Sequence, residues 1–136
     1  MSHYPAILEA DDGAFGVWFP DLPGCVAMGK TQDSALMNAN SALSDWVRTM
    51  EVKGFPIAPP TEVDELMKNP DVADSVREGS ICMLVPLIRE ACRQVKTNLS
   101  LDAGIVAAID ATAQRLGQTR SATVEILARR YLAELT

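Results

Sequence analysis

The feature that most constrains the fold of this chain is a short alternating segment, VKTNLSL at residues 95–101, with no strand after it to pair with. Successive residues of a strand point to opposite sides, so one face would be mainly apolar and the other polar. The polar face would carry Lys96, Asn98 and Ser100, and the other face Val95, Thr97, Leu99 and Leu101. A single strand leaves its backbone donors and acceptors unpaired, so we expect it to pair with the same strand of a second chain.

Two helical patterns follow this segment, and each has a recognisable start. Asp102 and Thr119 are suitable N-caps, and Gly117 is a suitable end for the first helix. The positions expected to face inward are Val106, Ile109, Ala113 and Leu116 in the first helix and Val124, Leu127, Ala128, Tyr131 and Leu135 in the second. One strand and two helices come close to the size at which a lone chain rarely supplies enough core, which also favours a dimer.

The N-terminal part of the chain has the pattern of strands followed by a helix. HYPAILEA and AFGVWFP flank the turn residues DDGA and predict a hairpin, and CVAMG predicts a short third strand. Thr31 is a suitable N-cap for a long helix that Gly54 and Pro56 would end. The apolar stripe of that helix is Ala35, Ala39, Leu43, Trp46, Val47 and Met50.

Two further elements are predicted before the C-terminal module. Thr61 would cap a short helix in TEVDELMKN, and SICMLVPL predicts one more, largely buried strand. The fold class is therefore α+β: a mainly antiparallel sheet with one packed helix in residues 1–88, followed by a small strand-helix-helix module in residues 89–136. Residues 87–94 fit either a helical turn or a linker.

The two modules differ in charge. Residues 1–88 hold 13 acidic and 5 basic residues, a net charge of −8, whereas residues 89–136 hold 5 acidic and 7 basic residues, a net charge of +2. Opposite signs in two segments indicate modules with different partners, and chance scatter in a small sample is the plainer alternative. The acidic module suits a basic partner, and the basic module suits nucleic acid.

Composition excludes several other classes of protein. The chain is 48% apolar, enough for a core, yet no apolar run reaches the roughly 18 residues that span a bilayer. The N-terminus lacks the pattern of a secretory signal. Cys25, Cys82 and Cys92 are odd in number and far apart, which argues against a disulfide scaffold or a zinc site and favours a cytoplasmic location.

Both modules resemble known families. Residues 95–135, KTNLSLDAGIVAAIDATAQRLGQTRSATVEILARRYL in their central part, resemble a ribbon-helix-helix DNA-binding domain. The N-terminal module is similar to that of HicB-type antitoxins in its F-P-D-L-P-G-C loop and in the G-x-T-x-x-x-A helix entry from Gly29. The resemblance implies a partial RNase H-like fold that neutralises a HicA-like, mRNA-cleaving toxin, and a C-terminal domain that represses the operon encoding both.

Three functions compete at this point. A nuclease would need carboxylates converging on metal ions, but Asp11 and Asp12 occupy a predicted turn and Asp21 lies in a loop where it would cap a turn. The lone histidine, His3, lies in the frayed start of the chain, where a nucleophilic site is not expected, so no catalytic residue, metal site or cofactor is predicted. A repressor with a small-molecule sensor is the second function, although Met28, Trp18 and Trp46 are expected in the core rather than in a pocket. The third function, an antitoxin, accounts for both charge signs.

The antitoxin hypothesis assigns roles to individual residues. Lys96, Asn98 and Ser100 would read base edges of operator DNA from the polar face of a two-stranded ribbon, unless that face is merely solvated. Thr119, Arg120 and Ser121 would hold the DNA backbone, since a helix N-terminus favours anions, although both hydroxyl residues could serve as caps. The residues expected to face the toxin are Asp11, Asp12, Glu62, Asp64 and Glu65. The chain should be a homodimer through residues 95–101, and a higher oligomer stays open.

Overall fold

A computed structural model of the chain describes residues 2–89 and 94–135. They form two compact units, Met1–Glu90 (unit 1) and Ala91–Thr136 (unit 2). Unit 1 contains β1 (His3–Asp11), β2 (Ala14–Trp18), β3 (Val26–Gly29), α1 (Gln32–Val52), α2 (Val63–Leu66), α3 (Pro70–Arg77) and β4 (Ile81–Pro86). Unit 2 contains α4 (Ala103–Leu116) and α5 (Arg120–Leu135). The chain is thus a mixed α+β protein, as predicted.

The sheet of unit 1 is antiparallel throughout, in the order β3-β2-β1-β4. The predicted hairpin is confirmed: β1 and β2 pair up to Asp11 and Ala14, leaving a two-residue turn between them. Asp12 and Gly13 both have positive φ angles, 42° and 85°. Such a turn matches the twist of the two strands, and Asp-Gly is a favoured sequence for it.

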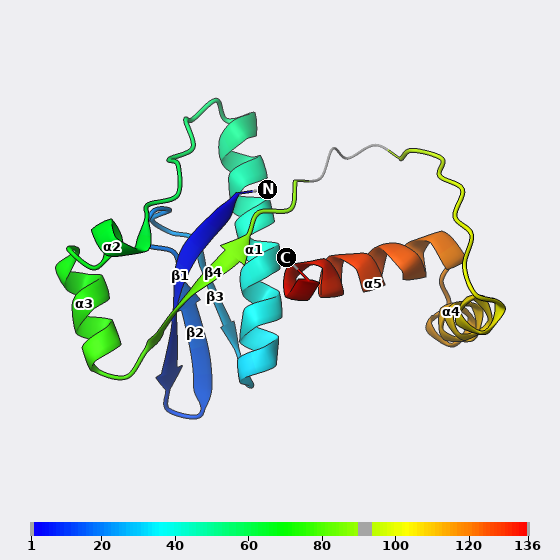
Figure 1. Cartoon of the computed structure of the whole chain (residues 1–136), viewed down its shortest axis with the longest axis horizontal. Helices are drawn as coiled ribbons and strands as arrows, with labels where there is room; N and C mark the ends of the chain where they lie inside the picture. Colours follow the sequence, from blue (N-terminus) through cyan, green and yellow to red (C-terminus); the bar gives the residue numbers. More distant parts are fainter. Residues whose placement is uncertain (1, 90–93, 136) are drawn as a thin grey trace. The chain divides into compact units, whose positions relative to one another are not determined.

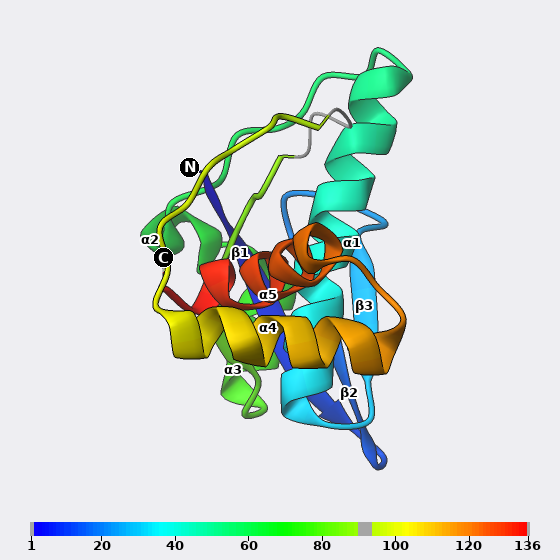
Figure 2. The same cartoon turned by 90° about the vertical axis from the view of Figure 1, so that its right-hand side faces the viewer.

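The long helix α1 packs on one face of this sheet (Figures 1 and 2). It begins as predicted, since the Thr31 hydroxyl accepts a hydrogen bond from the Ser34 N–H at 3.1 Å and the Ser34 side chain bonds back to the Thr31 N–H. The predicted stripe is largely confirmed, with Trp46 and Met50 half-buried at its margin. The helix residues in the core are Ala35, Ala39, Leu43 and Val47.

The loop after β2 is fixed by its own apolar residues and by one carboxylate. Phe19, Leu22 and Cys25 are buried beneath α1. Asp21 accepts hydrogen bonds from the Thr61 N–H at 2.8 Å and from the Thr61 hydroxyl at 2.5 Å. The predicted cap at Thr61 is therefore wrong, because its hydroxyl donates to Asp21 rather than accepting from α2, and the N-cap position is Glu62.

The opposite face of the sheet is covered by α2 and α3, so the prediction of a single packed helix is wrong. Ile7 on β1 packs with Leu66 and Val72 in a second, smaller core. Glu9 Oε1 accepts hydrogen bonds from Trp18 Nε1 at 2.9 Å and from the Ser75 hydroxyl of α3 at 3.1 Å. The start of α3 carries a usable signal in the sequence, because Asn69 caps a helix with proline at its first position.

Burial at the two edges of the sheet differs from the prediction. Ile81 and Leu84 of β4 are 53% and 56% exposed, because β4 is an edge strand with a neighbouring strand on one side only. Met28 of the other edge strand, expected in the core, is 60% exposed. After β4, the Ser44 hydroxyl donates to the Ile88 carbonyl, and residues 90–93 of the predicted linker region lie outside the described residues.

The helix ends of unit 2 are those predicted. Asp102 accepts from the N–H groups of Gly104 and Ile105, and Gly117 takes the left-handed conformation, φ 65°, that ends α4. Figure 1 shows α4 nearly end-on while α5 lies in the plane of the view, so the two helices cross.

The inward faces predicted for these helices are only partly right. Ala113 is buried and Val106, Ile109 and Val124 are half-buried. The exposed members of the predicted set are Leu116, Leu127, Ala128, Tyr131 and Leu135. The physical reason is that two crossing helices of one chain cover little of each other, and the buried position of α5 is Thr123.

Gly29 tests the packing of α1 on β3. A Cβ at this position would lie 2.4 Å from the Ala35 nitrogen and 2.4 Å from Ser34 Oγ. We expect Gly29→Ala to lower the free energy of unfolding by roughly 1–3 kcal/mol, because the helix start must move away from the sheet. Gly16→Ala is the matched control, since a Cβ there meets nothing within 4 Å. Urea denaturation would measure both, and equal stabilities would contradict the close approach.

Candidate functional site

The segment expected to read DNA is exposed along its length in the single chain. Residues 94–102 contain neither helix nor paired strand, and Lys96, Asn98 and Ser100 are exposed. Leu99 and Leu101, on the opposite face of the expected strand, are 66% and 49% exposed. Pairing of this segment with a second chain therefore remains a prediction.

The residues expected to hold the DNA backbone come together at the start of α5. The Thr119 hydroxyl accepts a hydrogen bond from the Ala122 N–H at 3.1 Å, so Thr119 caps the helix as predicted. The buried Thr123 hydroxyl donates to the Thr119 carbonyl at 3.0 Å. Ser121 is exposed beside this cap. The first N–H groups of a helix have no acceptor within the helix, which leaves this end suited to an anion.

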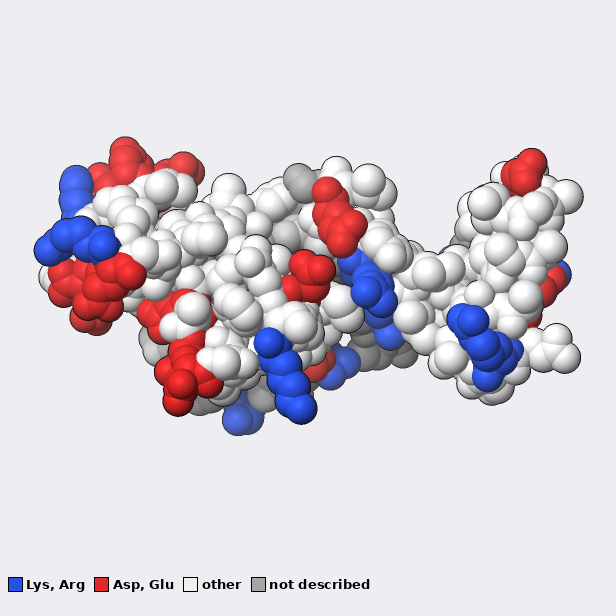
Figure 3. Space-filling view, turned by 90° about the horizontal axis from the view of Figure 1, so that it is seen from below, with Lys and Arg blue, Asp and Glu red and all other residues white. Residues whose placement is uncertain are grey.

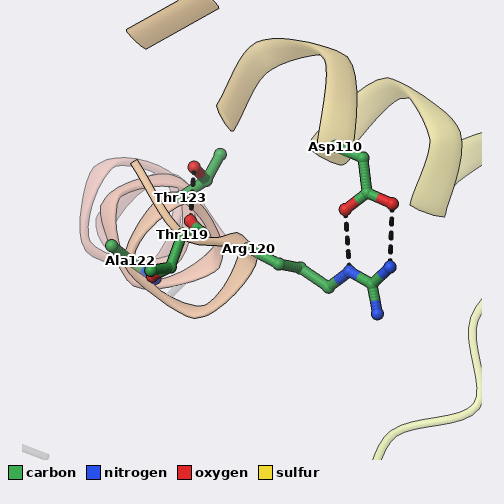
Figure 4. A network of polar contacts seen from close by, with 5 residues as sticks. All are labelled: Asp110, Thr119, Arg120, Ala122 and Thr123. Carbon is green, nitrogen blue, oxygen red and sulfur yellow. Dashed lines mark hydrogen bonds and ion pairs between the residues drawn. The ribbon is translucent and has the colours of Figure 1, made fainter. Parts of the chain in front are cut away.

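Arg120 was expected to contact a DNA phosphate, but in the structure its side chain forms an ion pair with Asp110. Its Nε donates to Asp110 Oδ1 at 2.7 Å and its Nη2 donates to Asp110 Oδ2 at 2.8 Å, as Figure 4 shows. The guanidinium lowers the pKa of Asp110, mainly through the hydrogen bond, and the carboxylate raises the pKa of Arg120. Asp110, on α4, was not singled out by the sequence, because no local pattern marks an acid as the partner of a residue on the next helix.

The acidic residues expected to face a toxin lie in two separate places. Asp11 and Asp12 are exposed at the tip of the β1–β2 hairpin, whereas Glu62, Asp64 and Glu65 are exposed at α2. Figure 3 shows acidic side chains gathered over the end of unit 1 that α2 and α3 form, with basic side chains among them. We call this the α2–α3 acidic face. It comprises Glu62, Asp64, Glu65, Asp71, Asp74 and Glu78.

Two basic residues reduce the charge of that face. Lys68 pairs with Glu65 at 2.9 Å and Arg77 pairs with Asp74 at 3.0 Å. Both pairs are solvent-exposed and join residues one helical turn apart. The α2–α3 acidic face therefore keeps an excess of negative charge, although part of it is neutralised locally.

The residues considered for catalysis have structural roles in this fold. Asp12 forms the hairpin turn and both oxygens of Asp21 are used by Thr61. Within residues 2–89 and 94–135, no group of three or more His, Cys, Asp and Glu residues could hold a metal ion. Burial raises the pKa of the Cys25 thiol to about 11, so it stays protonated at neutral pH. The same described residues include no helix long and apolar enough to cross a membrane.

Comparison with known proteins assigns the family. A family model described as the HicB-like antitoxin of a bacterial toxin-antitoxin system matches residues 4–128. The chain belongs to the HicB-like antitoxin family. The matched residues include nearly all of unit 1 and most of unit 2, so the family assignment rests on both units and not on one of them alone.

Solved structures of HicB proteins have the same fold. The crystal structure of the Burkholderia pseudomallei antitoxin HicB is 28% identical, has a TM-score of 0.54 and covers 98% of both chains. A chain of the HicA3 and HicB3 toxin-antitoxin complex is 26% identical, with a TM-score of 0.53, over 63% of this chain and 98% of that one. These similarities support an antitoxin role.

A phage protein is also similar in sequence. The 14.9 kDa protein of the rep-hol intergenic region of Haemophilus phage HP1 is 26% identical over 73 residues. The aligned region is 54% of this chain and 55% of the phage protein. The match thus extends over about half the length of that relative, and it adds no information about activity.

The Asp110–Arg120 pair makes a prediction about pH. A carboxyl group whose pKa is lower in the folded than in the unfolded state stabilises the fold above its ordinary pKa, here 3.8, and this contribution is lost as the pH falls through the folded value. Carboxyl NMR titration should place the Asp110 midpoint below 3.8, and Arg120→Gln should move it back upward. Arg115→Gln, which removes a charge without removing the pair, should leave it lowered. An Asp110 midpoint unaffected by Arg120→Gln would contradict the ion pair.

Proposed function

We propose that this protein neutralises a HicA-like, mRNA-cleaving toxin with unit 1 and represses its own operon by binding operator DNA with unit 2. The observation that carries the proposal is the family match over residues 4–128, which joins an acidic sheet-and-helix unit to a basic two-helix unit. We infer binding roles for both units rather than catalysis, with no cofactor. Unit 1 would be a partial RNase H-like domain and unit 2 a ribbon-helix-helix domain.

The exposed apolar surface of unit 2 supports a homodimer. Leu99 and Leu101 are joined by further exposed apolar residues on both helices, Ile105, Leu116, Ile126, Leu127, Tyr131, Leu132 and Leu135. So much apolar surface in a unit of this size is unusual for a monomer. Pairing of residues 95–101 with their copy would satisfy the strand backbone and cover this surface at once.

A two-stranded ribbon of this kind has the right width for the major groove of DNA. On its polar face Lys96 would approach guanine acceptors, Asn98 can bond adenine in a bidentate manner, and Ser100 is weakly selective. The start of α5 would then meet the DNA backbone, with Ser121 and the N–H groups of the first turn as donors. The net charge of +2 in residues 89–136 favours this approach.

The toxin would bind unit 1 through acidic surface. A protein that grips RNA must present positive charge, so an acidic surface speeds its association and competes with its substrate. Of the two acidic groups, the α2–α3 acidic face is the larger, and the hairpin residues Asp11 and Asp12 are a second candidate contact. A HicB relative of similar fold occurs in a toxin-antitoxin complex, which supports the same kind of partner here.

Alanine variants of the polar strand face test the DNA half of the proposal. Asn98→Ala should weaken binding to the DNA upstream of this gene by roughly 1–3 kcal/mol and relax selection at one base step of each half-site. Fluorescence anisotropy at fixed salt would measure this against Thr112→Ala, a change in the second half of α4. Unchanged affinity for Lys96→Ala, Asn98→Ala and Ser100→Ala alike would rule out base reading by this segment.

Charge reversal tests the toxin half. Asp64→Lys with Glu65→Lys should slow association with a HicA-like toxin by about tenfold at low salt, because the attraction between the surfaces is lost. The matched control is Asp45→Lys with Glu51→Lys on α1, which changes the charge equally; it breaks two ion pairs, whereas the test variant breaks one. Stopped-flow binding and growth under toxin expression are the measurements. Equal slowing in both double variants would point to net charge rather than to the α2–α3 acidic face.

A further inference from the structure

The contact between Arg120 and Asp110 has a defined geometry. Two nearly parallel hydrogen bonds, of 2.7 Å and 2.8 Å, use both oxygens of the carboxylate and two adjacent nitrogens of the guanidinium. A planar fork held at two points fixes the orientation of both side chains, which a single contact does not. Figure 4 shows the Arg120 side chain reaching from the start of α5 to Asp110 on α4.

The pair joins the two helices of unit 2. Arg120 is the first residue of α5, and Asp110 lies in the second half of α4. Between them the chain turns through Gly117, and the Gln118 N–H donates to the Ala113 carbonyl at 2.9 Å. Ala113 and Thr123 are the buried residues of the described part of unit 2. The side chains of Arg120 and Asp110 are 62% and 44% exposed, so the role of the pair lies in its two-point geometry, which fixes how the two helices are oriented beside so small a core.

We propose that Arg120 is a positioning residue: its ion pair with Asp110 sets the start of α5 against α4, and so aims the N–H groups of that helix end at a DNA phosphate. This inference rests on the DNA-binding function proposed above. It reassigns Arg120, which the sequence placed among the phosphate contacts on its position alone. The pair is neutral as a whole, so it offers a phosphate no net positive charge, and a phosphate would have to compete with a carboxylate already in place.

The direction in which Asp110→Asn changes the affinity for DNA distinguishes a positioning role of Arg120 from a phosphate contact. If Arg120 bound phosphate, Asp110→Asn would release the guanidinium and remove a negative charge, so DNA binding would tighten. If Arg120 positions α5, the same change loosens the helix start, and binding weakens by roughly threefold to tenfold despite the gain in positive charge. The probes are two fluorescein-labelled duplexes of equal length, one spanning the DNA upstream of this gene and one of random sequence.

Arg120→Lys and Arg115→Gln complete the experiment. Lysine keeps the charge but cannot form the two-point contact, so Arg120→Lys should weaken binding about as much as Arg120→Gln. Arg115→Gln controls for the loss of one positive charge on the neighbouring helix. In the full-length protein, Asp110→Asn and Arg120→Lys should each lower the unfolding temperature by a few degrees, and the double variant should lower it no further.

Each outcome bears on the proposal. Tighter binding by Asp110→Asn, or wild-type affinity for Arg120→Lys together with a loss for Arg120→Gln, would overturn it in favour of a direct phosphate contact. If the wild-type protein bound neither duplex, the proposed DNA function would fail. The unfolding temperatures would then test whether the pair holds the two helices together. A double variant no less stable than either single variant supports that role, and a double variant whose loss is the sum of the two single losses overturns it.

Discussion

Unit 2 can bury only a little apolar surface within one chain, and this constraint determines much of the rest of the molecule. Ala113 and Thr123 are its buried residues among those described, whereas Leu99, Leu116 and Leu135 stay exposed. Two short crossing helices cannot cover each other, so this surface favours association with a second copy. Within a single chain, polar contacts as well as this small core join α4 to α5, among them the bidentate Asp110–Arg120 pair.

Unit 1, in contrast, buries apolar surface within its own chain, because helices pack on both faces of its sheet. Leu43 of α1 fills one side, and Val72 of α3 fills the other. Two carboxylates, one of them the catalytic candidate Asp21, hold the loops and helices of this unit in place. Asp21 holds the chain before α2 through Thr61, and Glu9 holds α3 through Ser75. With these acids used internally, the negative charge available to a partner lies mainly on the α2–α3 acidic face.

This division fits a protein that would bind two different partners. A stable unit with a charged outer face can present a fixed surface to a protein toxin. A small basic unit completed only by a second copy would couple DNA binding to assembly, because the ribbon and its two helix ends would form together. Membership of the HicB-like antitoxin family links both units in one chain.

The sequence by itself determined the features that depend on neighbouring residues. Thr31, Asp102 and Thr119 cap the helices they precede, and the Asp12–Gly13 turn joins β1 to β2, because caps and tight turns are short-range interactions. Only the tertiary structure decided which distant residues meet. Asp21 bonds a residue 40 positions away, and Arg120 bonds the preceding helix rather than solvent. Such pairs follow from how elements cross and pack, and spacing along the chain carries no information about that.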